Sequence, residues 1–238
     1  MSKHLKRLAA PRSLQIHRKE SVWTIRPSSG THPLDVSIPL GVVVRDYLKL
    51  TDNQKETKRI ISNGEILVDE IVRKNYKFPC GLMDVISIPK LKQNYRLLFN
   101  QRGKLTLVLI KSSEAGWKLC RIENKTVTKG KQTQLNLHDG RNKIVKKDEY
   151  KTGDVIKISF KDKKIDDTFR FEKGTVSIII GGSHIGEVAN IQDFEIIPSS
   201  KPNLAKMKGK TTFSTLQKYV FPIGKEKPII ELPEVKVQ

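Results

Sequence analysis

The sequence predicts an α+β protein built from small modules: an α/β module, then β-rich modules, with basic extended segments at both ends. Apolar residues follow a helical spacing only within residues 40–63, and strand-like runs recur about every ten residues from position 65 onward. Residues 1–30 and 201–228 each hold seven Lys or Arg against one acidic residue. The predicted divisions are an N-terminal arm (1–39), an α/β module (40–92), a central β-rich region (93–172), a small barrel (173–212) and a C-terminal segment (213–238).

The first 39 residues show no regular apolar spacing and are interrupted by prolines at positions 11, 27, 33 and 39. This segment is strongly basic and has little apolar surface. It therefore favours an extended arm that is ordered by a polyanion rather than by a core.

The α/β module begins with two predicted helices. Val43, Val44, Tyr47 and Leu48 have the spacing of one apolar helix face. The second helix is expected to start at a capping box with Thr51 as N-cap and Gln54 at the third helical position, and to end at 63–64, Asn-Gly.

Strands are expected from residue 65 onward. A hairpin at 65–73 turns at Asp69-Glu70, and a strand at 84–88 is ended by Pro89. Further predicted strands, which favour a small barrel or sandwich, lie at 95–99, 105–110, 117–122, 134–137, 154–160, 175–180, 186–191 and 229–232.

The charge predicts a nucleic-acid binder. The chain has 45 Lys and Arg against 25 Asp and Glu, a net charge of +20 and a pI near 9.9. The alternative is a merely solvated basic surface. Lys55, Lys58 and Arg59 share one helix face, Arg45 and Lys49 lie on the preceding helix, and a basic run follows the hairpin. The residues predicted to bind RNA are Lys3, His4, Lys6, Arg7, Arg12, Arg18, Lys19, Arg26, Arg45, Lys49, Lys55, Lys58, Arg59, Arg73, Lys74, Lys77, Lys206, Lys208 and Lys210.

Other function classes find little support. Cys80 and Cys120 lie too far apart for a typical zinc site, and they indicate buried thiols in a reducing compartment. Ser183 and His184 are neighbours whose side chains point to opposite faces of a strand, and Gly181-Gly182 lies in a hairpin rather than a phosphate loop. No apolar run has the length of a membrane span, and the N-terminus lacks a secretory apolar segment. We therefore expect a cytoplasmic protein with no catalysis, cofactor, metal, membrane partner or small-molecule substrate.

Two segments resemble known modules. Residues 42–88, with Ile60-Ile61-Ser62-Asn63-Gly64 followed by Glu65-Ile66-Leu67-Val68-Asp69, resemble the S-four RNA-binding domain. Residues 175–191, with apolar alternation around Gly186, resemble a KOW motif. Each module occurs in several protein classes, so an RNA-modifying enzyme or accessory protein, or a KOW-type transcription elongation factor, remains an alternative.

The flanking segments resemble one family more specifically. His4-Leu5-Lys6-Arg7-Leu8-Ala9-Ala10-Pro11, together with residues 26–32, 81–88 and 219–225, is similar to the archaeal and eukaryotic small-subunit ribosomal protein four-e family. This resemblance runs over essentially the whole chain. It implies a non-catalytic protein of the cytoplasmic ribosome that binds small-subunit ribosomal RNA beside neighbouring ribosomal proteins.

Overall fold

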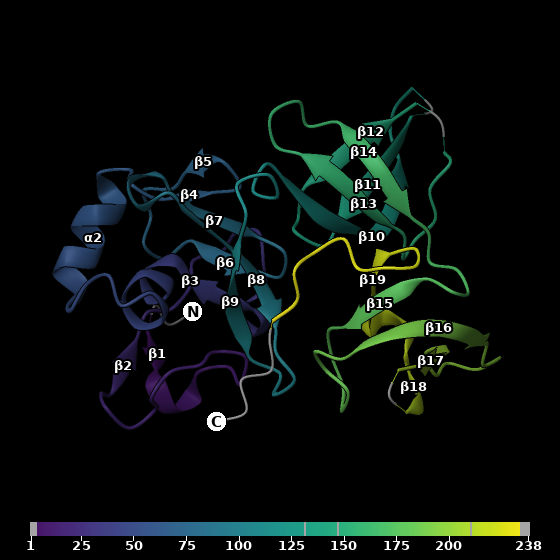
Figure 1. Cartoon of the computed structure of the whole chain (residues 1–238), viewed down its shortest axis with the longest axis horizontal. Helices are drawn as coiled ribbons and strands as arrows, with labels where there is room; N and C mark the ends of the chain where they lie inside the picture. Colours follow the sequence, from purple (N-terminus) through teal and green to yellow (C-terminus); the bar gives the residue numbers. More distant parts are fainter. Residues whose placement is uncertain (1–3, 131, 147, 210, 234–238) are drawn as a thin grey trace. The chain divides into compact units, whose positions relative to one another are not determined.

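The computed structural model describes residues 4–130, 132–146, 148–209 and 211–233. The chain divides into two compact units, Met1–Leu98 with Lys104–Lys118 and Phe99–Gly103 with Leu119–Gln238. Strands dominate both units (Figure 1). The described part of the chain contains no helix whose length and apolarity would let it span a bilayer.

The helices of the first unit lie where the apolar spacing predicts them. α1 (Leu40–Val42) continues into the π-helical turn η3 (Val43–Tyr47), and α2 follows at Gln54–Ser62. Val42, Val43 and Val44 are fully buried, and Gly64, two residues beyond α2, has the left-handed conformation (φ 79°) that ends a helix.

The predicted N-cap of α2 is wrong by two residues. Asn53 is the N-cap, and its side-chain oxygen accepts hydrogen bonds from the backbone N–H groups of Lys55 and Glu56. The Glu56 carboxylate accepts in return from the Asn53 side chain. Thr51 instead lies buried, with its hydroxyl 2.7 Å from that of Thr57. Several residues here could cap a helix, and the burial of Thr51 decides between them.

The main sheet of the first unit has the order β5-β4-β7-β8-β9. Asp69 and Glu70, both at positive φ (54° and 60°), form the predicted turn between the first two strands. The predicted boundary at 92/93 is wrong because the first residues of β8, from Gln93 to Arg96, pair with β7 and so extend this sheet. The strands are β4 (Leu67–Val68), β5 (Ile71–Val72), β7 (Val85–Ile88), β8 (Gln93–Phe99) and β9 (Leu105–Ile110).

Smaller elements complete the first unit. Two short antiparallel pairs accompany three 3-10 turns. They are β1 (Leu5–Lys6) with β2 (Trp23–Thr24), β3 (Ser37–Pro39) with β6 (Pro79–Gly81), η1 (Arg7–Ala9), η2 (Leu34–Val36) and η4 (Pro89–Leu91).

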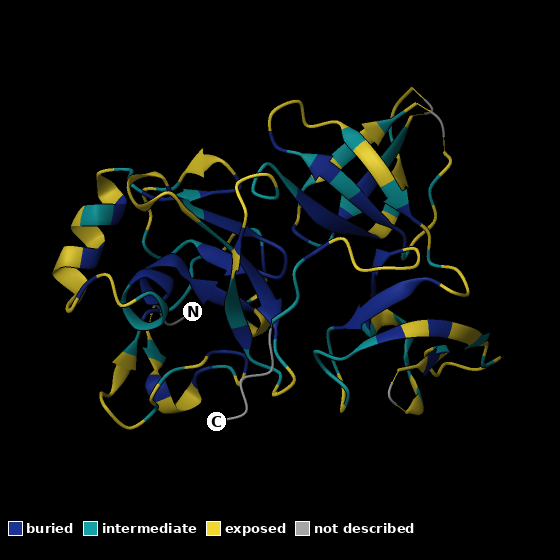
Figure 2. Cartoon of the chain, viewed as in Figure 1, coloured by how far each residue is buried: buried dark blue, intermediate teal, exposed yellow. Residues whose placement is uncertain are grey.

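The N-terminal segment differs from the predicted extended arm. Ala10, Leu14 and Ile25 are buried, and the Arg18 guanidinium donates to the carbonyl oxygens of Leu8, Ala10 and Pro11. These residues pack in the first unit as turns rather than as a helix or a long strand. Their apolar side chains therefore have no periodic spacing in the sequence, and Figure 2 shows buried stretches between exposed ones.

The second unit begins with a five-stranded sheet of order β12-β11-β10-β13-β14. Alternating side chains such as Ile122, Leu135 and Ile156 form its core. The strands are β10 (Trp117–Val127), β11 (Thr133–Leu137), β12 (Asn142–Val145), β13 (Val155–Ser159) and β14 (Ile165–Phe169).

A second five-stranded sheet has the order β18-β17-β16-β15-β19. It surrounds a core that includes Ile191, Met207 and Val220. The predicted boundary at 212 is wrong because β18 begins there and β19 returns to pair with β15. The elements are β15 (Val176–Ile179), β16 (Val188–Glu195), β17 (Leu204–Lys208), β18 (Thr212–Leu216), η5 (Gln217–Tyr219) and β19 (Val220–Gly224).

The strand predicted at 229–232 is absent from these described residues. The backbone N–H of Ile229 donates to the carbonyl oxygen of Ile223, and Ile230 is buried. The apolar pair thus packs without joining a sheet, which is consistent with the prolines on either side of it.

Candidate nucleic-acid interface

Helix α2 and the segment that follows β5 meet at Tyr76. The Lys58 ammonium lies 4.8 Å from the centre of the Tyr76 ring, and the Lys77 ammonium lies 5.7 Å from it. The Tyr76 carbonyl accepts a hydrogen bond from the backbone N–H of Gly41 at the start of the helical region. One aromatic ring therefore holds cations from two segments side by side.

Further cations extend this surface. The Arg73 guanidinium lies 4.4 Å from the centre of the Phe78 ring. A Cβ atom built on Gly64 would lie 4.0 Å from Cε of Lys74, so the stem of this lysine passes the end of α2. We call the resulting set the α2 surface; it comprises Lys55, Lys58, Arg59, Arg73, Lys74 and Lys77.

The α2 surface is exposed and carries little opposing charge. Lys55, Lys58, Arg59 and Lys74 are exposed, whereas Arg73 and Lys77 are half-buried beside their aromatic partners. The single acidic residue within α2, Glu56, is used in the helix cap. The structure thus brings together the helical and post-hairpin cations that the sequence predicts to share a face. Tyr76 was not predicted, although an aromatic residue within the run Arg73-Lys74-Asn75-Tyr76-Lys77 was a usable signal.

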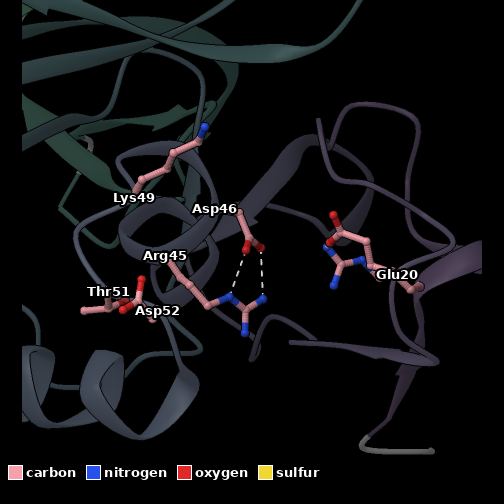
Figure 3. A pocket seen from close by; sticks show the side chains of 7 residues that line it. Glu20, Arg45, Asp46, Lys49, Thr51 and Asp52 are labelled. Atoms are coloured by element: carbon pink, nitrogen blue, oxygen red, sulfur yellow. Dashed lines mark hydrogen bonds and ion pairs between the residues drawn. The ribbon is translucent and has the colours of Figure 1, made fainter.

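Arg45 in the preceding helical turn, and Lys49 just beyond that turn rather than on a helix as predicted, lie in a different environment. Arg45 forms a two-pronged ion pair with Asp46, with N–O distances of 2.8 and 3.0 Å (Figure 3). This hydrogen bonding is the largest cause that raises the pKa of Arg45 above its ordinary value. The pair lines a hollow of about 370 Å³ with Arg7, Glu20, Lys49, Thr51 and Asp52. The three acidic side chains of this hollow offset its three basic ones, so it offers a phosphate no net positive charge.

The N-terminal cations differ in their partners and in their exposure. Arg7 is buried and bonds to Glu20 at 3.1 Å, and Arg18 bonds to three backbone carbonyls, so both hold the segment in place. Arg26 is half-buried. The exposed members are His4, Lys6, Arg12 and Lys19.

The C-terminal cations lie mainly on β17. Lys206 and Lys208 are exposed, and the Lys206 ammonium lies 4.0 Å from the Glu195 carboxylate. Lys3 and Lys210 lie outside the described residues.

The first unit also contains a buried ionic cluster, which links Lys118 to two carboxylates and a histidine. Lys118 Nζ lies 2.7 Å from Asp69 Oδ2 and 2.9 Å from Asp84 Oδ1, and His32 Nε2 lies 3.0 Å from Asp84 Oδ2. Burial raises the pKa of Asp84, but Lys118, His32 and the donating Gly81 N–H outweigh it and hold the pKa well below the usual range. The cluster positions Asp69 in the hairpin turn. No group of three or more His, Cys, Asp or Glu within the described ranges has the arrangement of a metal site.

Known proteins resemble this chain over most of its length. The model of the ribosomal family S4e matches residues 91–165, and that of the RS4NT (NUC023) domain matches residues 1–35. The small ribosomal subunit protein eS4 of Methanothermobacter thermautotrophicus is 49% identical over 97% of this chain and 96% of its own length. The eS4 protein of Archaeoglobus fulgidus is 46% identical over 96% and 97%.

A solved structure has the same fold. The crystal structure of the 30S ribosomal protein S4e from Thermoplasma acidophilum matches with a TM-score of 0.69 at 35% identity, covering 80% of this chain and 95% of that one.

Proposed function

This chain belongs to the ribosomal family S4e, and on that premise we propose that it is a structural constituent of the small ribosomal subunit that binds ribosomal RNA through the α2 surface. The observation that carries the proposal is that Lys58 of α2 and Lys77 share the Tyr76 ring while Arg73 lies over the Phe78 ring. The family's named role supports it and includes no chemical reaction.

The mechanism is electrostatic and geometric. Lysine and arginine side chains on this surface neutralise phosphates and release their counterions. The helix and the hairpin fix the spacing of these charges, so the surface reads the shape of folded RNA more than its sequence. No cofactor, membrane or small-molecule substrate takes part in this binding.

The modules form the finer part of the proposal. The order of two helices followed by a hairpin in residues 40–88 supports an S-four-like domain. The β15–β19 sheet supports a KOW-type barrel. In it Gly186 has a φ of 78°, and a Cβ atom there would lie 2.4 Å from the carbonyl carbon of Asn100. The partners are small-subunit ribosomal RNA and neighbouring ribosomal proteins, in cytoplasmic ribosomes.

The two other functions that the sequence left open gain no support. The curated relatives reported above match from end to end and are named for the small ribosomal subunit. We therefore prefer this role to an RNA-modifying enzyme or accessory protein and to an elongation factor. Co-sedimentation of the native protein with small subunits at moderate salt separates the three.

The direct test replaces Lys55, Lys58 and Arg59 together by Ala. Binding of small-subunit ribosomal RNA should weaken, and the slope of log affinity against log salt should become shallower by roughly 2–3, because three phosphate contacts are lost. A matched control replaces Lys161, Lys163 and Lys164, which are exposed in the β13–β14 turn. Equal losses in both triple variants, with both folds intact by circular dichroism, would mean that net charge rather than this surface controls binding.

A further inference from the structure

The ribbon formed by β1 and β2 has one outward side. Lys6 lies directly opposite Trp23, and Leu5 lies opposite Thr24. Opposed residues of an antiparallel pair project to the same side, and alternate residues share a side. His4, Lys6 and Trp23 therefore occupy one side of the ribbon, and all three are exposed. Leu5 and Thr24 are half-buried on the other side.

Trp23 is unusually exposed for a tryptophan, with 55% of its surface accessible. The other tryptophan of the chain, Trp117, has the Arg96 guanidinium 4.6 Å from its ring centre. The His4 ring lies 5.6 Å from the Trp23 ring at an angle of 54°, which is a tilted contact rather than flat stacking. The indole therefore presents a large π surface at the outside of the molecule.

The charge around Trp23 indicates what kind of molecule would cover it. Lys6 lies beside the indole, and Arg12 and Lys19 are exposed in the same segment. Glu20 is the one acidic residue in the first 34 of the sequence, and it is bonded to Arg7. An exposed aromatic ring amid cations matches a nucleic-acid strand, in which a flat base lies next to a phosphate.

We propose that Trp23 is a stacking platform for an unpaired RNA base, with Lys6 neutralising a neighbouring phosphate. This inference rests on the proposed function, and it adds a contact of a different chemistry from that of the α2 surface. The α2 surface recognises phosphates. The ribbon would also recognise the presence of an unstacked base, because every base offers a π face.

A fluorescence experiment tests the stacking directly. Trp117→Phe leaves Trp23 as the single tryptophan. An oligoadenylate RNA should bind this protein and quench its tryptophan emission, because the base lies against the indole. An abasic oligonucleotide of the same length should bind through its phosphates without comparable quenching.

Substitutions separate the base contact from the charge. Trp23→Leu should weaken oligoadenylate binding roughly 5- to 100-fold, the equivalent of one lost base stack, and Trp23→Phe should retain most of the affinity. Lys6→Ala should weaken both probes alike and reduce the salt slope by about 1. Val22→Ala is the matched control, since Val22 is also an exposed apolar residue and directly precedes Trp23.

The outcomes are distinguishable. Normal oligoadenylate binding by Trp23→Leu, or equal quenching by both probes, overturns the stacking proposal and leaves the proposed function standing. Unchanged RNA affinity combined with poor incorporation of Trp23→Leu into small subunits would identify the ribbon as a protein contact, which also overturns it. Failure of the unaltered protein to bind any RNA would remove the proposed function itself.

Discussion

At the scale of single residues, the buried cluster of Lys118, Asp69 and Asp84 decides how the first unit tolerates change. Each carboxylate bonds to the one ammonium group, and each also accepts a backbone N–H, from Val85 and Gly81 respectively. The charges are thus desolvated but well paired. Such a cluster adds little net stability over an apolar one, yet removal of one partner leaves uncompensated buried charge.

Lys118→Met should therefore destabilise the protein strongly. Two buried carboxylates would lose their cation, and the expected loss is about 3–5 kcal/mol in the free energy of unfolding. The control is Lys90→Met, because the Lys90–Glu65 pair has an exposed lysine and should change stability by less than about 0.5 kcal/mol. Urea unfolding of both variants measures the difference; similar values for the two would show that the cluster does not carry this energy.

Tyr47 supplies a pH-dependent prediction. Burial raises the pKa of its phenol to about 12, although the Gln15 N–H that donates to its oxygen opposes the shift. Between about pH 10, where an unfolded tyrosine ionises, and pH 12, the folded state holds a proton that the unfolded state has lost. Stability contributed by this group is therefore complete below pH 10 and decreases as the pH rises to 12.

Absorbance titration of phenolate tests this directly. The difference between the wild-type protein and Tyr47→Phe should show one group that ionises near pH 12. A difference curve centred near pH 10 would contradict the burial argument, and circular dichroism over the same range confirms that the fold persists.

At the scale of elements, the sequence predicts the helix end and the hairpin turn, because the residues at those positions determine them locally. Gly64 correctly ends α2, because glycine readily accepts the positive φ needed there, and Asp69-Glu70 correctly turns the hairpin. The N-cap of α2 was not predictable in the same way. Thr51 and Asn53 both have side chains that suit an N-cap, and only tertiary packing buries Thr51 against Thr57.

The cap of α2 yields a prediction for this element. Asn53→Ala removes the acceptor of two backbone N–H groups and should cost about 1 kcal/mol of stability. Gln54→Ala, at an exposed position one residue later, should be nearly neutral. Thermal unfolding of the two variants checks the assignment, which fails if the Gln54 variant is the less stable.

The N-terminal segment was the least predictable element. Its buried residues have no period, and its order depends on Arg18 reaching backbone carbonyls 7 to 10 residues earlier. The sequence analysis predicts Arg18 to be an RNA contact, because nothing in the sequence indicates that its guanidinium bonds to backbone carbonyls of the same chain.

Limited proteolysis distinguishes a packed segment from an extended arm. Because cleavage requires local unfolding, trypsin should cut the free wild-type protein slowly after Arg12 and rapidly in Arg18→Ala. Lys19→Ala, which removes an exposed neighbouring cation, should leave the rate at Arg12 unchanged. Equally rapid cleavage of the wild-type protein would restore the arm interpretation.

At the scale of the whole molecule, sequence predicts the strands but not their partners. Short strands at regular spacing correctly indicate β-rich modules. Yet β19 pairs with β15 across the 40 residues that separate the two strands, and β8 extends the first sheet rather than opening the next module. Long-range pairing depends on which apolar faces close together, so both predicted boundaries fell inside a sheet.

The sequence also does not predict which cations contact phosphate, because it does not show which of them are paired within the protein. Eight to ten phosphate contacts would give a salt slope of roughly −6 to −9. Arg45 and Lys55 contribute equally to the net charge of +20, but they differ in structure. Arg45 is bonded to Asp46 in the polar hollow, whereas Lys55 is exposed on the α2 surface.

Single-charge variants of these two residues therefore test whether position or net charge controls binding. Lys55→Ala should make the salt slope for small-subunit ribosomal RNA shallower by about 0.7–0.9, the contribution of one phosphate. Arg45→Ala removes the same formal charge but no phosphate contact, so its slope should match that of the wild-type protein. Titrations over a series of salt concentrations measure both. Equal changes in the two variants would mean that the field of the whole molecule, rather than the contact geometry, governs its association with RNA.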